Sequence, residues 1–112
     1  LGHAWEMIRG TGLNFVFEAH KVPLYEGAWE FALDWVFPGG SVANRDWLEG
    51  MDAGGWDEAV EEAHRGLLTD AQTSGGLLMA WPQEVEVPPE FSVIGRIEEA
   101  DSPTSGCLKV LG

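Results

Sequence analysis

The chain has 112 residues, with 19 acidic against 6 basic side chains, a formal net charge of -13, one cysteine and 45% hydrophobic residues. This length supports a single domain over residues 1–112. The negative charge repels phosphate backbones and anionic lipids, so we expect neither nucleic acid nor a membrane as a partner. A lone cysteine, no recognisable secretory leader and no apolar run long enough to span a bilayer predict a cytoplasmic protein.

The first third of the chain is predicted to alternate helix and strand. Apolar residues recur at helical spacing from Leu1 to Ile8, and the glycines that follow predict the end of a helix. The aromatic-rich run Leu13–Glu18 favours a strand. Helical spacing returns over residues 28–35 and ends before Pro38.

Residues 38–55 lose this periodicity and are dominated by glycine, asparagine and aspartate. They predict a long loop that can include a helical turn around Trp47, and loops of this length are often functional. Helical spacing from Trp56 predicts a third helix ending near Gly66, with its acidic residues on a solvated face.

The last third is predicted to supply most of the strands. Residues 77–81 form a continuous apolar run between two glycines and Pro82, as expected of a central strand covered on both faces. Residues 92–98 and 107–111 favour two more strands. The element order predicts an α/β (α+β) domain with a mixed sheet of about four strands and helices packed on it.

The most distinctive motif, residues 70–76, directly precedes the apolar run and reads Asp-Ala-Gln-Thr-Ser-Gly-Gly. Paired glycines allow close backbone approach, and consecutive amides with the Thr73 and Ser74 hydroxyls offer donors to a phosphate. The alternative is an ordinary tight turn whose polar side chains satisfy the backbone. Asp70 is likewise either a Mg2+ ligand or, more commonly, a turn acceptor.

Other chemistry-bearing residues give weaker signals. His3, His20 and His64 lack the paired spacing of a zinc site. Cys107 has no evident base beside it, which favours a small buried hydrophobe over a nucleophile. Trp47 in the predicted loop is a candidate for exposure at an interface. The residues themselves therefore predict no metal site and no catalytic group.

Residues 70–79 resemble the C-terminal signature of the selenophosphate synthetase (selenide, water dikinase) family, which usually reads D-P-Q-T-S-G-G-L-L. Ala71 is the one departure within it. Further stretches match in the same order and extend the resemblance over nearly the whole chain: L-G-H at 1–3 with E-M at 6–7, V-P-L at 22–24 with G-A at 27–28, P-G-G at 38–40 with Asn44, and I-G-R at 94–96.

The resemblance implies the C-terminal domain of a two-domain, usually homodimeric enzyme of the aminoimidazole-ribonucleotide-synthetase-like superfamily. Such enzymes make selenophosphate from selenide, ATP and water, releasing AMP and phosphate. In the family the reactive cysteine or selenocysteine, the essential lysine and most metal-binding aspartates lie in the N-terminal domain, which would be this chain's partner. ATP and Mg2+ are then expected in the full enzyme, with neither bound tightly by this chain alone.

Carried over position by position, the resemblance implies two sets of residues. Those facing the nucleotide phosphates would be Asn44, Gln72, Thr73, Ser74, Gly75 and Gly76. Those on the interdomain rim would be His3, Gly39 and Gly40. One departure is a helix that the family has after residue 81, where this chain has only residues 83–91 with two consecutive prolines. One face of the sheet would then be open, or covered by another chain.

Two other functions remain possible from the sequence. One is another ATP-dependent synthetase or kinase of the same superfamily, such as a thiamine-monophosphate kinase or a hydrogenase-maturation protein, although the intact Gln-Thr-Ser-Gly-Gly run speaks against it. The other is a non-catalytic acidic interaction module. The shortened segment after residue 81 favours that module, and the preserved loop disfavours it.

Overall fold

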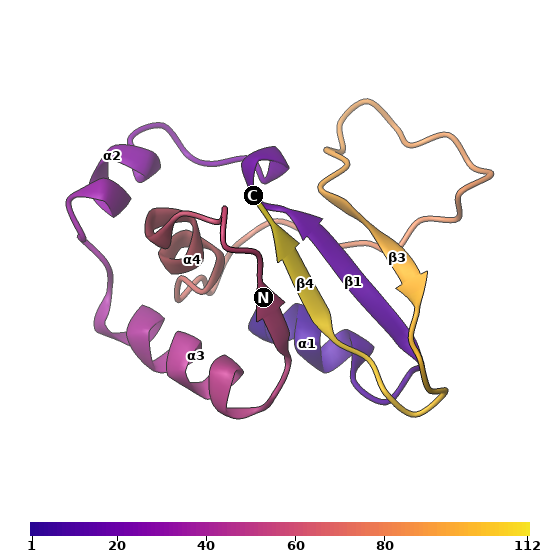
Figure 1. Cartoon of the computed structure of the whole chain (residues 1–112). Coiled ribbons are helices and arrows are strands. Elements are labelled where there is room, and N and C mark those ends of the chain that lie inside the picture. The colour runs from indigo at the N-terminus through magenta and orange to yellow at the C-terminus, as the bar shows by residue number, and fades with distance from the viewer.

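The structure is a computed structural model that describes all 112 residues. Its elements, in chain order, are α1 (Gly2–Ile8), β1 (Leu13–Glu18), the 3-10 helix η1 (Ala19–Lys21), α2 (Ala28–Leu33), α3 (Gly39–Gly50), β2 (Gly54–Trp56), α4 (Glu62–Leu68), β3 (Gly95–Glu99) and β4 (Leu108–Leu111) (Figure 1). No helix among them is long and apolar enough to cross a bilayer.

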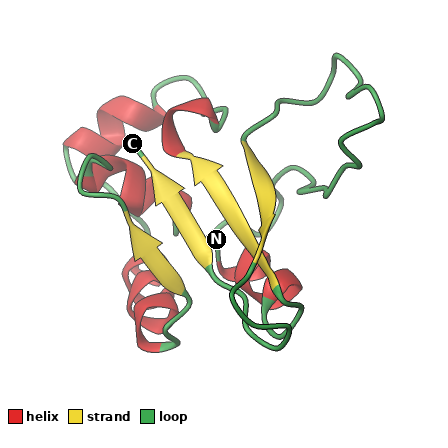
Figure 2. Cartoon of the chain, turned by 45° about the vertical axis from the view of Figure 1, so that its right-hand side comes forward, coloured by secondary structure: helices red, strands yellow, loops and turns green.

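The four strands form one mixed sheet in the order β2-β4-β1-β3. β4 runs parallel to both β1 and β2, whereas β3 runs antiparallel to β1. β1 is buried at four consecutive positions, as expected of an inner strand. The predicted architecture of about four strands with helices packed on them is therefore confirmed (Figure 2).

The hydrophobic core lies between the sheet and the helices. Phe15 and Phe17 lie on the same face of the sheet as Leu108 and Val110, because β1 and β4 pair in that register. This face packs against α1 and α3 in one buried cluster, which comprises Ala4, Ile8, Phe15, Phe17, Ala19, Leu48, Ala53, Val60, Leu108 and Val110. The predicted helix at residues 1–8 and strand at residues 13–18 are confirmed.

The predicted long loop at residues 38–55 is wrong, because most of it forms α3. The helix places Ser41, Asn44 and Leu48 on one side at helical spacing, and only the last of them is apolar. Ser41 and Leu48 are buried, whereas Val42 is exposed. A search for apolar periodicity misses such a helix because Leu48 is its only buried apolar residue, and Asn44 on the same side is exposed.

The predicted third helix begins later and ends later than expected. Trp56 belongs to β2, and α4 then runs through Gly66 to Leu68. A Cβ atom at Gly66 would lie 2.4 Å from the ring of Phe37. Gly66 therefore permits close packing inside the helix and does not end it, although glycine commonly marks helix ends.

The predicted central strand at residues 77–81 is also wrong. The segment forms no backbone hydrogen bond, and Leu77 is 85% exposed. β2 occupies the remaining place in the sheet beside β4. A short apolar run indicates a tendency to be buried, but it has no alternating pattern that specifies a strand partner. The sequence therefore could not show whether residues 77–81 or residues 54–56 pair with β4.

Candidate functional site

The start of α3 and the segment before the glycine-rich loop are held together by hydrogen bonds. Ser41 Oγ donates to Asp70 Oδ1 at 2.5 Å and accepts from the Ala71 N–H at 3.2 Å. Asn44 Nδ2 donates to the Thr69 carbonyl at 3.2 Å. These contacts join positions about 30 residues apart, so the fold itself positions the loop.

Small side chains allow this close approach. A Cβ atom at Gly40 would lie 3.1 Å from the Ala71 Cβ, tighter than most such contacts. Thr69, which is buried, turns its hydroxyl back to the carbonyls of Arg65 and Gly66 at the end of α4. The two predicted rim glycines, Gly39 and Gly40, thus form the first turn of α3 rather than a loop.

Asp70 is a hydrogen-bond acceptor within this junction. One carboxylate oxygen accepts from Ser41, and the other accepts from Gln72 Nε2 at 2.7 Å. Desolvation raises its pKa, but the hydrogen bonds from Ser41, Gln72 and the Ala71 N–H together hold the pKa below its ordinary value. Of the two roles left open by the sequence, the structure supports the turn acceptor.

The depressed pKa of Asp70 predicts a contribution to stability that disappears in acid. The carboxylate stabilises the fold fully above about pH 4, its ordinary pKa, and this stabilisation is lost as the pH falls through the lower, folded-state pKa. We expect Asp70→Asn to show a smaller loss in the free energy of unfolding between pH 7 and pH 3 than the unaltered chain. Urea unfolding at pH 7 and pH 3 measures this loss for each variant.

Asp101→Asn is the matched control, because Asp101 is exposed and accepts no side-chain hydrogen bond. This variant is expected to retain the pH dependence of the unaltered chain. Equal pH dependence in Asp70→Asn and Asp101→Asn would show that the hydrogen bonds of Asp70 do not stabilise the fold.

The glycine-rich loop itself presents free backbone donors. Residues 73–76 are exposed, and their N–H groups have no hydrogen-bond partner in the chain. The N–H groups of Gly39 and Gly40 are also unpaired, because Pro38 at the N-cap offers no side-chain cap and the first backbone bond of this end is made by Ser41. The free N–H groups of the loop and those at the start of α3 therefore lie on two segments that the Ser41–Asp70 hydrogen bond joins.

Other residues singled out from the sequence lie elsewhere. His3 is on an exposed side of α1, where Nδ1 lies 2.9 Å from Glu6 Oε2, and it makes no hydrogen bond to the loop. Cys107 directly precedes β4, and its Sγ donates to Asn14 Oδ1 at 3.1 Å. Trp47 lies on α3 and is partly exposed. No group of three or more His, Cys, Asp or Glu side chains could hold a metal ion.

Sequence reasoning missed Ser41, although it is the side chain that joins the two segments. It is 3% exposed, unusually low for a serine. The available signal was its spacing. Ser41 and Leu48, seven residues apart after Pro38, lie on one helix face and are both buried, whereas Asn44 on that face is exposed.

Comparison with known proteins identifies the relatives of this chain. It is 47% identical over 87 residues to the selenide, water dikinase of Carboxydothermus hydrogenoformans and 38% identical over 84 residues to that of Caldanaerobacter subterraneus subsp. tengcongensis. Each match covers 75% of this chain and 24% of the relative. The protein of the same name from Pseudomonas straminea is 33% identical over 108 residues, covering 88% of this chain and 30% of that protein.

No family model and no solved structure matches the chain. The chain spans only about a quarter of the length of the curated relatives above, and the similarity extends over most of its own residues. The predicted resemblance is confirmed at this level: the chain is a member of the selenide, water dikinase family over the region that it shares with those proteins.

Proposed function

We propose that this chain forms the C-terminal domain of an ATP-dependent selenide, water dikinase and lines the side of the ATP site that faces the phosphates. The observation that carries the proposal is the exposed loop of residues 73–76, with its free N–H groups, joined to the free N–H groups at the start of α3. Backbone donors of this kind bind anions, and the helix dipole adds partial positive charge.

The proposal assigns phosphoryl-transfer chemistry to the rest of the enzyme. Residues 66–95 contain no lysine or arginine, and both carboxylate oxygens of Asp70 already accept hydrogen bonds. Phosphoryl transfer requires Mg2+ and cationic side chains to offset the charge of the transferred group. These would come from the N-terminal domain, in a homodimer, while this chain orients the phosphates. The overall reaction would convert selenide, ATP and water into selenophosphate, AMP and phosphate.

A chimera tests this assignment directly. The matched region of the Carboxydothermus hydrogenoformans relative, which is 47% identical, is replaced by this chain. We expect the purified chimera to release AMP and phosphate from ATP only when selenide is present, because the introduced domain supplies an equivalent phosphate-facing surface. A chimera that folds, judged by circular dichroism and cooperative melting, but that lacks selenide-dependent turnover would contradict the proposal.

Gly76→Pro within the chimera tests the role of the loop amides. The substitution removes one N–H group at a position where an added Cβ meets no atom within 4 Å. We expect the KM for ATP to rise about tenfold, the cost of one lost hydrogen bond to a charged group. Ala80→Pro removes an equally unpaired N–H outside the loop and is the matched control, with an unchanged KM.

Calorimetry of the chain alone tests whether it binds nucleotide without the rest of the enzyme. With Mg2+ and cationic groups supplied elsewhere, the chain is expected to bind Mg-ATP with a Kd weaker than about 1 mM. Micromolar binding by the chain alone would place the essential phosphate contacts within it and overturn the proposed division of labour.

A further inference from the structure

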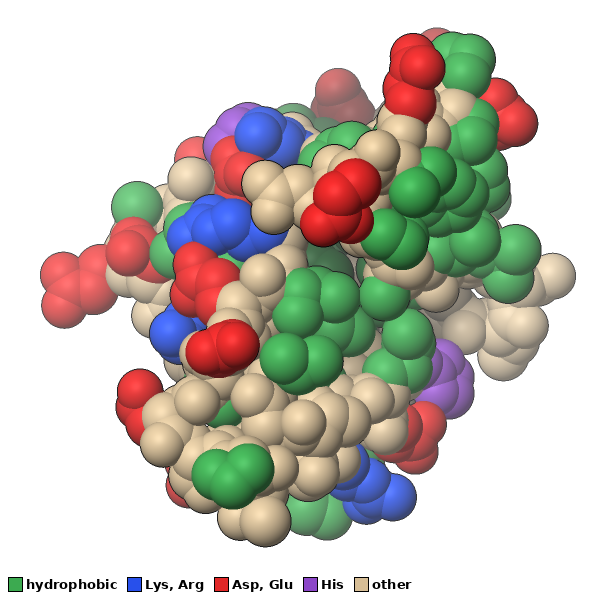
Figure 3. All heavy atoms as spheres, turned by 90° about the vertical axis from the view of Figure 1, so that its right-hand side faces the viewer, with side chains coloured by type: hydrophobic (Ala, Val, Ile, Leu, Met, Phe, Trp, Pro, Cys, Tyr) green, Lys and Arg blue, Asp and Glu red, His purple; other side chains and the backbone are tan.

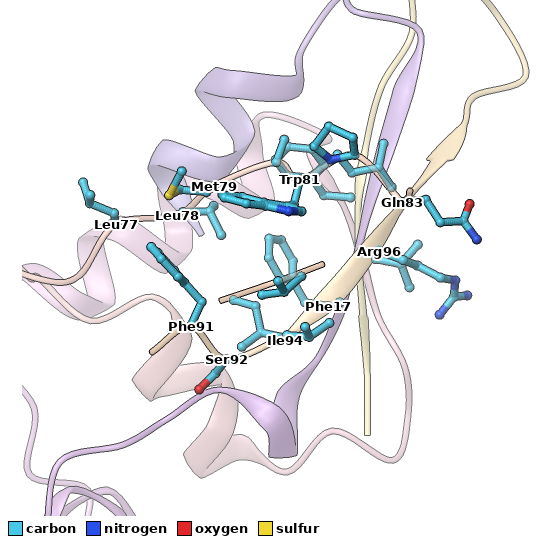
Figure 4. Close-up of a pocket in the computed structure, with 18 of the residues that line it drawn as sticks. Phe17, Leu77, Leu78, Met79, Trp81, Gln83, Phe91, Ser92, Ile94 and Arg96 are labelled. Atoms are coloured by element: carbon cyan, nitrogen blue, oxygen red, sulfur yellow. The ribbon is translucent and has the colours of Figure 1, made fainter. Parts of the chain in front are cut away.

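An apolar groove lies between the β1–β3 side of the sheet and residues 77–93. Its volume is about 590 Å3, and 14 of its 19 lining residues are hydrophobic. Trp81 and Phe91 lie on one side of it, with Phe17 and Ile94 on the other (Figure 4). A volume of this size suits the burial of side chains from a bound molecule.

The edge strand beside this groove has unpaired backbone groups. The Glu18 N–H donates to the Ile94 carbonyl at 2.9 Å, which fixes the phase of the antiparallel β1–β3 pair. Alternate residues of β3 therefore direct their backbone groups away from β1, namely Gly95, Ile97 and Glu99. No other strand lies beyond β3, so the backbone groups of Gly95 and Ile97 have no partner in the chain, whereas the Glu99 carbonyl accepts a hydrogen bond from Asn14 Nδ2 at 3.5 Å.

The free edge and the groove are adjacent, because one residue belongs to both. Ile97 lines the groove, is 42% exposed, and carries outward-facing backbone groups. An extended segment that paired with β3 would project every second side chain toward the Ile97 face of the sheet. Backbone pairing with apolar pockets for alternate side chains is an established way for a sheet edge to bind a peptide.

The charge around the groove indicates the kind of partner. Residues 82–94 carry three exposed acidic side chains, Glu84, Glu86 and Glu90, and no cation. The one charged residue that lines the groove is Arg96, and its guanidinium is already paired with Glu98, with Nη2 lying 2.7 Å from Oε1. Figure 3 shows apolar side chains gathered on this side of the molecule, with acidic side chains and some lysine or arginine side chains around them. A cationic segment would be attracted to this rim, whereas a second copy of the chain, with a net charge of -13, would be repelled.

We propose that β3 and its adjoining groove bind an extended peptide segment in which apolar side chains alternate with lysine or arginine. The peptide backbone pairs with Gly95 and Ile97, and its apolar side chains enter the groove. Its cations alternate onto the opposite face of the added strand and are attracted by the net negative charge of the chain. This interaction goes beyond the proposed role in the ATP site and uses no residue of the loop at 73–76.

Fluorescence anisotropy with the full chain tests the proposal. The probe is a labelled, end-capped heptapeptide of alternating lysine and valine. We expect saturable binding that weakens several-fold between 50 and 500 mM salt, because the attraction between exposed charges is screened. Replacing each lysine by glutamate should weaken binding at least tenfold, and methylating every backbone nitrogen should do the same by removing the strand's donors. Equal binding of the N-methylated probe would overturn the strand-pairing proposal.

Ile97→Thr provides the protein-side test without changing charge. We expect about fivefold weaker binding from the lost apolar contact. Val42→Thr is the matched control, since Val42 is an exposed aliphatic residue on α3, and its affinity should stay within twofold. Should Ile97→Thr fail to fold, the N-methylated probe decides the question with the unaltered chain.

Two other occupants of the groove are a second copy of the chain and the rest of the enzyme. Sedimentation tests the first of them. A chain that is a dimer on its own, and a monomer as Ile97→Thr, would show that a second copy covers the groove and would overturn the proposal. Unchanged affinity for the probe in the dikinase chimera supports it, because the site is then separate from the ATP site and its interdomain surface. Loss of probe binding there would show that the rest of the enzyme occupies the groove, and would likewise overturn it.

Discussion

Gly54→Ala is expected to lower the free energy of unfolding by about 3 kcal/mol, the upper range for forcing a side chain into a glycine-only conformation. Gly54 has a φ of 134°, and an added Cβ would lie 1.8 Å from the Leu108 carbonyl oxygen. The obstacle is backbone, which no rotamer change can relieve. Because Gly54 pairs with Leu108, the substitution should separate β2 from β4. Urea denaturation followed by circular dichroism measures the loss.

Gly55→Ala is the matched control for this prediction. Gly55 is the next residue of the same strand, lacks a positive φ, and offers open space to an added Cβ, with no atom within 4 Å. It should change the free energy of unfolding by less than about 1 kcal/mol. Equal effects of the two substitutions would mean that loss of glycine as such, and not the contact with β4, determines the result.

Ile8→Ala is expected to destabilise the chain by about 2–4 kcal/mol. Ile8 is 1% exposed at the end of α1 and belongs to the cluster between the helices and the sheet. Truncation removes buried methylene and methyl groups and leaves a cavity that close-packed neighbours fill only in part. The same denaturation measurement applies, with a reduced midpoint and an unchanged slope as the expected signature.

Met7→Ala tests whether burial is the cause. Met7 is the preceding residue of the same helix but is 46% exposed, so its truncation should cost less than about 1 kcal/mol. Comparable losses for Met7→Ala and Ile8→Ala would indicate that helix formation, and not core packing, limits the stability of this region.

Elements with regular apolar patterns were predictable from the sequence, and those with mixed faces were not. The runs ending at Ile8 and at Glu18 form the predicted helix and strand because one chemical property repeats at one period. α3 was not predictable because Leu48 is its only buried apolar residue, so no apolar repeat marks the helix. Residues 77–81 were misassigned because apolar character alone does not specify a strand partner.

The candidate site was predictable in composition but not in geometry. The motif at residues 70–76 indicated backbone donors for an anion, and the structure leaves the donors of residues 73–76 free. Its connection to Ser41 depends on a contact across about 30 residues, and a single sequence carries no periodic signal for such a pair. The phosphate-facing role of the loop remains a prediction, for which the chimera is the test.

The position of β4 has a consequence for synthesis on the ribosome. β4 lies between β1 and β2 and is the partner of both, yet its residues are among the last of this sequence to be translated. Until Leu108–Leu111 emerge from the exit tunnel, β2 has no neighbouring strand and the apolar face of β1 lacks Val110 beside it. Nascent chains stalled before this point should therefore expose apolar strand surface of the kind that chaperones bind.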